Sequence, residues 1–231
     1  MNSTKKTARL AGLLYVLVSI PGAFSLLYVP SHFVVSGDAT ATANKIAASE
    51  FVFRICIVAE LTGFIGFIFV VRALYLLLSG VNKTHASLML TLMLVSIPIS
   101  LLNVLNEIAA LTLVRGADFL SVLDKPQRDA MAMLFLDLHH YGVVVPQIFW
   151  GLWLVPFGIL VFRSGFLPRI LGVLLIIACF GYVADSVTPL LFPRYVHIVS
   201  RFASKLTLGE LPIIFWLLIM GAKDQPLAVP V

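Results

Sequence analysis

The sequence predicts an all-α integral membrane protein, a bundle of six transmembrane helices. Of the 231 residues, 60% are hydrophobic and 12% are charged, against roughly 25% charged in an ordinary soluble domain. Apolar runs recur along the chain, most of them near or above the ~20 residues that a helix needs to cross a ~30 Å hydrocarbon layer. No hydrophilic stretch is long enough for a second domain, so we expect residues 1–231 to form a single transmembrane domain. The predicted spans are 10–29, 51–78, 85–114, 129–162, 168–188 and 200–221.

The first span follows a short basic segment, a pattern shared by secretory signals and first transmembrane helices. Its apolar run of about 20 residues exceeds the ~7–15 residues of a signal core, which favours a retained helix. Pro30 ends the run. Residues 39–48 then combine helical propensity with little apolar mass, which predicts a short surface helix outside the membrane.

The second and third spans carry ionisable side chains within apolar sequence. Glu60 lies close to mid-membrane, where its side chain cannot reach the headgroups, and Arg54 is its expected cationic partner. In the third span, Asn103 and Glu107 continue a row of polar residues spaced three or four apart. Such a polar stripe on a helix must face protein and not lipid.

The fourth span carries the run Asp137-Leu138-His139-His140-Tyr141-Gly142. At ~100° per residue, Asp137, His140 and Tyr141 share one helical face, while His139 points roughly the opposite way. We expect the face with Asp137 to be the polar one. Just before this helix, Asp124 and Gln127 have the spacing of a capping box.

The fifth and sixth spans each contain one acidic residue. The fifth ends near Asp185, and the run Gly209-Glu210-Leu211-Pro212 interrupts the sixth. The segment from Gly209 to Gly221, about 13 residues, would extend only ~20 Å as a helix, which is too short to cross the membrane alone. Either the helix begins near Ser200 and bends at Pro212, or a surface helix leads into a broken one.

The alternating directions of the spans place acids and a histidine from five helices at one depth. A charged side chain at the bilayer centre costs about 2.5–3.5 kcal/mol or more, so matched depths favour a shared polar pocket, which we expect to open away from the termini. Its candidate residues are Arg54, Glu60, Asn103, Glu107, Asp137, His140, Tyr141, Asp185 and Glu210.

The orientation follows from the flanks of the spans. Six spans put both termini on one side of the membrane, and the basic residues are divided evenly between the two sides. The basic flank of the first helix and two short basic turns on the same side favour cytoplasmic termini. The basic residues form no stripe, which argues against a nucleic-acid partner.

Several motifs resemble a family of bacterial membrane proteins. The most specific is the turn Arg163-Ser164-Gly165-Phe166-Leu167-Pro168, and others are Leu134 to His139, Tyr141-Gly142 and Gly181-Tyr182. Over most of its length the chain resembles the bacterial integral membrane proteins of domain-of-unknown-function family 4386. The resemblance implies a multi-helix protein of the bacterial inner membrane and brings no activity with it.

Three functions fit these residues. The sequence favours a protein that binds or transports a small molecule or an ion, a role in which six helices are few unless the protein dimerises into a homo-oligomer. A membrane-embedded metal-dependent hydrolase is the alternative, because Asp137 and His140 have the spacing by which a carboxylate and an imidazole can share a metal. Asp137 can equally serve only to orient the His140 ring. In a purely structural protein, the same residues would hold helices together.

Several other chemistries lack their motifs. The chain has no G-x-S-x-G, no G-x-x-x-x-G-K-[ST] and no G-x-G-x-x-G, which removes support for a serine esterase, a nucleotide-driven pump and a dinucleotide enzyme. Cys56 and Cys179 stand alone in apolar segments without a C-x-x-C pair. We therefore read them as buried thiols, and no cofactor can be named from the sequence.

Overall fold

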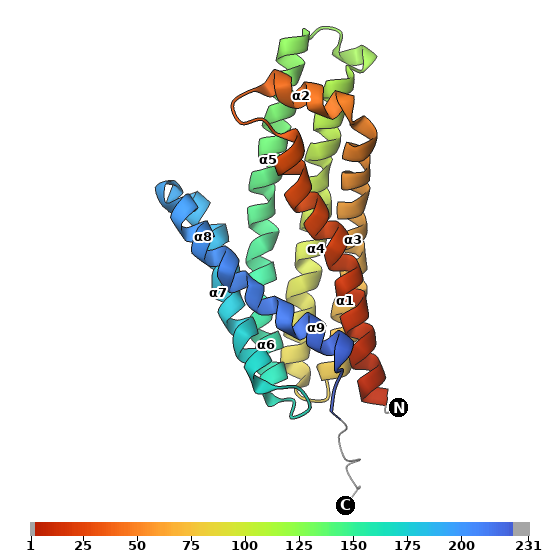
Figure 1. Cartoon of the computed structure of the whole chain (residues 1–231), viewed down its shortest axis with the longest axis vertical. Helices are drawn as coiled ribbons and strands as arrows, with labels where there is room; N and C mark the ends of the chain where they lie inside the picture. Colours follow the sequence, from red (N-terminus) through yellow and green to blue (C-terminus); the bar gives the residue numbers. More distant parts are fainter. Residues whose placement is uncertain (1–2, 224–231) are drawn as a thin grey trace, which may run out of the picture. The chain divides into compact units, whose positions relative to one another are not determined.

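The computed structural model describes residues 3–223 and is all-α over that range, which confirms the predicted fold class (Figure 1). The helices are α1 (Ser3–Tyr28), α2 (Ala39–Ala48), α3 (Glu50–Leu78), α4 (Lys83–Arg115), α5 (Lys125–Leu152), α6 (Leu154–Arg163), α7 (Arg169–Leu191), α8 (Val196–Thr207) and α9 (Leu211–Ile219). A π-helical turn, η1 (Val29–Phe33), and three 3-10 turns, η2 (Asp118–Leu120), η3 (Pro193–Tyr195) and η4 (Leu208–Glu210), join them.

Six helical segments in the described part of the chain are long and apolar enough to cross a membrane. They are Thr4–Phe33, Glu50–Leu78, Lys83–Arg115, Lys125–Arg163, Arg169–Leu191 and Pro193–Ile219. Many large apolar side chains on these segments are exposed, among them Leu27, Leu102 and Phe180. Such apolar surfaces are stable against lipid and not against water. The protein is therefore an integral membrane protein whose helices contact the bilayer.

The contacts between residues divide the chain into two compact units. Unit 1 comprises the described parts of residues 1–17, 66–96 and 144–231, and unit 2 comprises residues 18–65 and 97–143. Helices α1, α3, α4 and α5 each contribute one portion to either unit. A single transmembrane domain over the whole chain stays a prediction.

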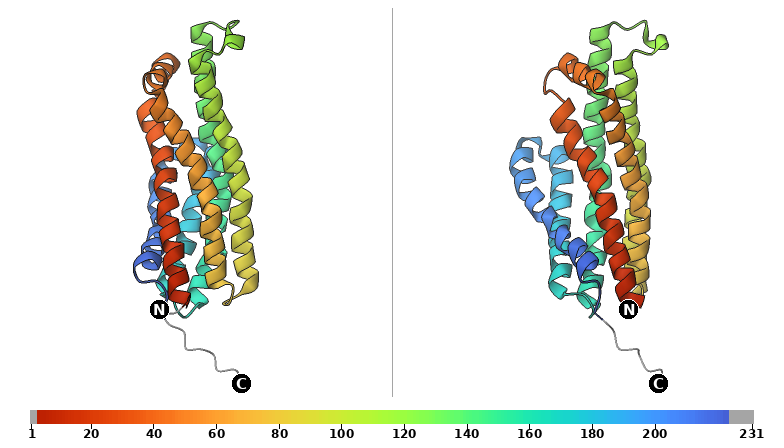
Figure 2. Two further views of the ribbon diagram at one scale, coloured as in Figure 1. Left: turned by 90° about the vertical axis from the view of Figure 1, so that its right-hand side faces the viewer. Right: turned by 45° about the vertical axis from the view of Figure 1, so that its right-hand side comes forward.

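Unit 2 packs the ends of four long helices around an apolar core. Phe33, Ile46, Phe53 and Val104 are fully buried there, and the rings of Phe33 and Phe53 meet edge to face with centroids 5.2 Å apart. The predicted short helix is present as α2, which runs crosswise to α3 (Figure 2). It closes this end of the unit by burying its apolar side chains on the core.

The ends of two helices in unit 2 are capped as their sequences indicate. The Asp38 carboxylate accepts from the backbone N–H of Ala41 at 2.8 Å and so caps α2. Ahead of α5, the Gln127 N–H donates to Asp124 Oδ1 at 2.8 Å and the Asp124 N–H donates to Gln127 Oε1 at 3.0 Å. This reciprocal pair is the predicted capping box.

Unit 1 is assembled by close approach of helices at glycines. A Cβ built on Gly158 of α6 would lie 2.6 Å from the carbonyl oxygen of Gly172 on α7, and one on Gly12 of α1 would lie 2.3 Å from the backbone nitrogen of Leu218 on α9. Only glycine, which has no Cβ, allows two helices to approach this closely. Such close packing is common between membrane helices, because in lipid no hydrophobic effect drives them together. α8 folds back along α7, as the right-hand view of Figure 2 shows.

Aromatic rings fill the interior of unit 1. Trp153, at the junction of α5 and α6, is 1% exposed and stacks on Phe157 with centroids 5.2 Å apart. Phe67 meets the Trp153 ring edge-on at 5.8 Å, and Tyr15 lies against Phe67 at 5.2 Å. The packing fixes the Tyr15 ring, whose hydroxyl then points at the break between α8 and α9.

The predicted interruption of the last span is present. α8 ends at Thr207, η4 follows as a 3-10 turn, and α9 begins at Leu211 with Pro212 in its first turn. Proline fits there because the N–H that it lacks would have had no intrahelical partner. The helix begins at Val196, close to Ser200, and the break at residues 208–210 lies just ahead of Pro212 within one apolar segment, Pro193–Ile219, so the chain is nearer to the first alternative.

Candidate functional site

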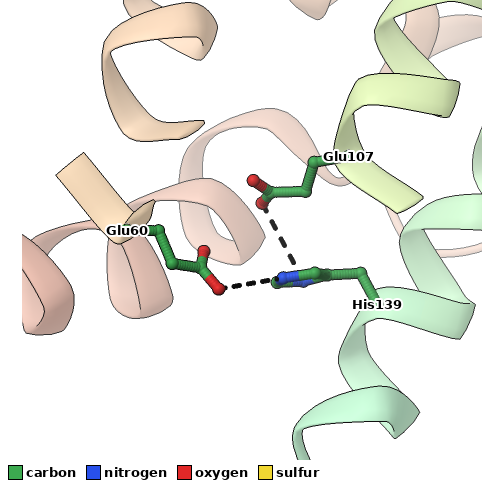
Figure 3. A group of neighbouring side chains, drawn as sticks. All are labelled: Glu60, Glu107 and His139. Carbon is green, nitrogen blue, oxygen red and sulfur yellow. Dashed lines mark hydrogen bonds and ion pairs between the residues drawn. The ribbon is translucent and has the colours of Figure 1, made fainter. Parts of the chain in front are cut away.

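Three buried ionisable side chains from three helices meet in unit 2 (Figure 3). Nε2 of His139 on α5 lies 3.1 Å from Oε1 of Glu60 on α3, and its Nδ1 lies 3.8 Å from Oε1 of Glu107 on α4. Both glutamates are 1% exposed, and His139 is 9% exposed. We refer to these three residues as the Glu–His–Glu cluster.

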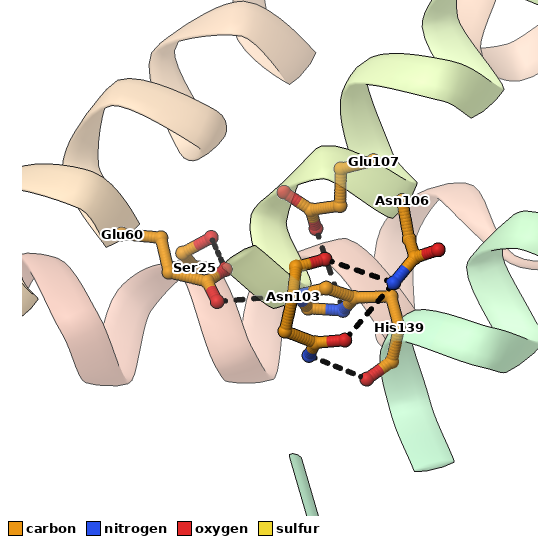
Figure 4. A network of polar contacts seen from close by, with 6 residues as sticks. All are labelled: Ser25, Glu60, Asn103, Asn106, Glu107 and His139. Atoms are coloured by element: carbon orange, nitrogen blue, oxygen red, sulfur yellow. Dashed lines mark hydrogen bonds and ion pairs between the residues drawn. The ribbon is translucent and has the colours of Figure 1, made fainter. Parts of the chain in front are cut away.

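Neighbouring polar groups orient the Glu–His–Glu cluster (Figure 4). The buried Ser25 hydroxyl of α1 donates to Oε2 of Glu60 at 3.3 Å. Asn103 Nδ2 donates to the backbone oxygen of His139 at 2.9 Å, and Asn106 Nδ2 in turn donates to Asn103 Oδ1 at 3.1 Å. These bonds tie α4 to α5 at the level of the histidine and fix one oxygen of Glu60.

Gly142 makes room for this arrangement. A Cβ at position 142 would lie 1.9 Å from Asn103 Oδ1 and 2.6 Å from its Cγ, far inside any real contact distance. Asn103 occupies the space that a side chain would take. The glycine one helical turn after His139 is therefore part of the site.

Glu107 is the least satisfied member. Within residues 3–223, its buried Oε2 atom has no hydrogen-bond partner, whereas Oε2 of Glu60 accepts from Ser25. Leaving a buried polar atom unpaired costs about 1–3 kcal/mol, and more for a charged group. Such an atom needs an explanation beyond stability.

The charges in the Glu–His–Glu cluster do not balance by themselves. With both carboxyls ionised, even a doubly protonated imidazole leaves one negative charge over. A buried net charge is strongly disfavoured, so a further proton or a cation must supply the missing positive charge.

A second polar cluster lies in unit 1. Tyr15 of α1 donates its hydroxyl to Oε1 of Glu210, and Tyr182 of α7 donates to Oε2 of the same carboxylate at 2.8 Å. We refer to these three residues as the Tyr–Glu–Tyr cluster. Both oxygens of its carboxylate are bonded, each by a hydroxyl from a different helix.

Asp185, also in unit 1, is satisfied in a similar way. Gln147 Nε2 donates to its Oδ2 at 3.0 Å, and the Ser200 hydroxyl donates to its Oδ1. These contacts join α5, α7 and α8. The acid acts as a junction between helices.

The structure brings together three of the nine predicted pocket residues in unit 2, namely Glu60, Asn103 and Glu107. Asp185 and Glu210 lie in unit 1 with the partners described above. A single pocket lined by all nine remains a prediction.

The other four predicted pocket residues are exposed. Asp137, His140 and Tyr141 lie on the outer side of α5, where the His140 and Tyr141 rings contact each other at 5.7 Å. Their proposed roles, including metal binding by Asp137 and His140, stay predictions. Arg54 pairs with Glu50 at 2.7 Å and not with Glu60.

Sequence reasoning did not single out His139. The structure shows that it shares the buried face of α5 with Ala132 and Leu136, at steps of four and three, but Leu134 and Leu138 make another face equally apolar, so the sequence carried no signal for it. Ser25, Tyr15 and Tyr182 were also missed, because a lone hydroxyl in an apolar helix carries no pattern.

The apolar helices define a multi-pass integral membrane protein, and a buried Glu–His–Glu cluster lies among its helices. Residues 10–221 match the model of the family described as "Domain of unknown function (DUF4386)", and the chain belongs to that family. The resemblance seen in the sequence is thereby confirmed.

One curated relative gives a shorter match. An "Uncharacterized protein" of Archaeoglobus fulgidus is 40% identical over 77 residues, which cover 33% of this chain and 44% of that protein. No solved structure matches the chain.

Proposed function

We propose that this protein binds a divalent metal ion within the membrane, held by Glu60, Glu107 and His139. The observation that carries the proposal is the buried, unpaired Oε2 of Glu107 beside two further ligand groups. One donor atom from each of the three residues lies within 4.8 Å of the others. Ligands of a tetrahedral site with bonds of about 2.0–2.2 Å are roughly 3.4 Å apart, so small side-chain shifts suffice.

The charge of the donor set supports the same proposal. Two carboxylates and a neutral imidazole neutralise a divalent cation, and a neutral complex is what a low-dielectric interior favours. Mixed imidazole and carboxylate ligands suit Zn²⁺, Mn²⁺ and Fe²⁺. Ser25 and Asn103 would supply the outer hydrogen bonds that hold such ligands in place.

The cellular setting follows from the flanks of the helices. We place the protein in the inner membrane, as the family resemblance implies, and we place both termini in the cytoplasm because basic residues precede the first span. A site contributed by three membrane-spanning helices suits an ion carrier. The second candidate is a membrane-embedded hydrolase, favoured by the count of three protein ligands, which in catalytic zinc sites leaves one position for water.

Metal analysis of the purified protein tests the proposal. The chain offers a matched pair, because His139 is buried and the adjacent His140 is exposed. After equilibration with Zn²⁺ and desalting, we expect about one zinc per chain in the wild type and in His140→Ala, and less than about a tenth of that in His139→Ala. Glu107→Gln, which keeps the shape of the side chain, should lose zinc as well.

Two outcomes would overturn this assignment. Equal zinc in His139→Ala and the wild type would exclude the Glu–His–Glu cluster as the site. Loss of zinc in His140→Ala alone would move the site to the exposed face of α5. If zinc binds at the Glu–His–Glu cluster, an uptake experiment separates the two candidate functions. Zn²⁺ uptake by vesicles containing the wild type but not Glu107→Gln would favour a carrier, and bound zinc without uptake would favour the hydrolase.

A further inference from the structure

Helix α8 carries a row of basic residues. Arg194 lies in the η3 turn just before the helix, and His197, Arg201 and Lys205 follow on α8 at steps of four, so these three share one side of the helix. All four are exposed. Residues 186–209 contain no aspartate or glutamate, and within residues 3–223 no ion pair joins Arg201 or Lys205 to an acid.

The other two faces of α8 differ from this basic row. One packs on α7, where the carbonyl oxygen of Ala203 would lie 2.8 Å from a Cβ at Gly181, and where Ser200 bonds to Asp185. The remaining face carries the exposed apolar side chains of Ile198 at 58% and Phe202 at 61%, and Leu206, at 39%, borders the packed face, because its Cβ lies 2.9 Å from a Cβ built on Gly181. Viewed along its axis, α8 thus shows a packed face, an apolar face and a basic face.

The depth of the basic row makes it unusual. Gly181 lies near the middle of α7 (Arg169–Leu191), a helix long and apolar enough to cross the membrane. Because Ala203 packs against Gly181, the neighbouring Arg201 and Lys205 start from well inside the bilayer. Cations at that depth extend toward the headgroups and are stabilised by an anion or by water.

We propose that α8 binds an anionic phospholipid, with its phosphate on Arg201 and Lys205 and its acyl chains along Ile198, Phe202 and Leu206. The adjacency of the two exposed faces carries this choice. An amphiphile has an anionic head directly joined to apolar tails, which matches a basic face beside an apolar face. A free phosphate would use the basic row alone and would gain nothing from the apolar one.

Native mass spectrometry in a neutral detergent tests the proposal. Wild-type protein is titrated with phosphatidylglycerol and, separately, with phosphatidylcholine, and the bound lipid is counted. We expect phosphatidylglycerol to be preferred, and Arg201→Gln/Lys205→Gln to weaken its retention roughly 25-fold, about fivefold for each charge removed.

The chain offers a matched control in unit 1. Arg72 and Lys83 are also exposed and basic, and Arg72→Gln/Lys83→Gln should retain phosphatidylglycerol as the wild type does. The charge-preserving exchange Arg201→Lys/Lys205→Arg should also retain it, which distinguishes lost recognition from a misfolded helix.

Three results would overturn the proposal. They are equal retention of both lipids by the wild type, equal loss of phosphatidylglycerol in the α8 and control variants, and full displacement of the lipid by soluble glycerol phosphate at the same concentration. The last would identify a site for free phosphate and not for a lipid.

Discussion

The two buried carboxylate clusters use similar groups and satisfy them differently. In the Tyr–Glu–Tyr cluster of unit 1, each carboxylate oxygen of Glu210 accepts a hydrogen bond from a hydroxyl, one from Tyr15 and one from Tyr182. In the Glu–His–Glu cluster of unit 2, Oε2 of the fully buried Glu107 has no partner among the described residues.

This difference separates a structural contact from a binding site. A carboxylate whose oxygens are all bonded within the protein holds helices together, as polar groups between membrane helices commonly do. A carboxylate with a free buried oxygen lowers stability until something binds it. Burial and residue type are shared by the two clusters, so satisfaction of hydrogen bonds is the property that distinguishes them.

The largest expected effect comes from replacing the central acid of each cluster with leucine. Glu210→Leu should lower the stability of the metal-free protein by about 1–3 kcal/mol, because the buried Tyr15 hydroxyl loses its acceptor. Glu107→Leu should leave it unchanged or raise it, because an unsatisfied buried acid is removed. Thermal unfolding of both variants and the wild type in one detergent, with a chelator present, measures these changes. Each kcal/mol should shift the midpoint of unfolding by about 2–4 °C.

The comparison fails if both leucine variants lose the same stability, since Glu107 would then be as well satisfied as Glu210. Added Zn²⁺ sharpens it further. The metal should raise the unfolding temperature of the wild type and of Glu210→Leu, and should leave Glu107→Leu unchanged.

A smaller effect is expected from a methyl group beside the Glu–His–Glu cluster. Gly142→Ala forces the Asn103 side chain away and breaks its bond to the backbone of His139, at a cost of about 1–2 kcal/mol and with weakened zinc binding. Gly22 in the same unit has no atom within 4 Å of a built Cβ, so Gly22→Ala is the matched control and should be neutral or slightly stabilising. Unfolding midpoints and zinc content together check this pair, and a Gly142→Ala variant that melts and binds zinc like the wild type would remove Gly142 from the site.

Much of the fold and part of the site follow from the sequence. Spans of ~20 apolar residues can be recognised directly in the sequence. The polar stripe that contains Asn103 and Glu107 has to face the protein interior, and both side chains are buried. Glu60 was predicted for the same reason, as an acid too deep to reach the headgroups.

The choice between two adjacent histidines could not be made by the polar pattern. Asp137 draws attention to the face with His140, yet that face is exposed, and His139 shares the buried face of Ala132 and Leu136. Both faces of α5 carry apolar residues, because Leu134 and Leu138 are exposed while Ala132 and Leu136 are buried, so the apolar pattern could not identify the packed face either.

The partner of Arg54 shows the same limit at short range. Glu60 follows Arg54 by six residues, about 240° around the helix, so the two side chains point apart. Glu50 precedes it by four residues and therefore shares its face, and the pair forms at 2.7 Å. The tyrosine donors of Glu210 lie far from it in sequence, and no local spacing announces them.

Anomalous X-ray diffraction from protein crystals soaked in Zn²⁺ tests the central claim most directly, because it locates the metal. We predict one strong peak about 2.0–2.2 Å from the ligand atoms of Glu60, Glu107 and His139, absent from crystals of Glu107→Gln. A peak only at Asp137 and His140, or none among the helices of unit 2, would contradict the account.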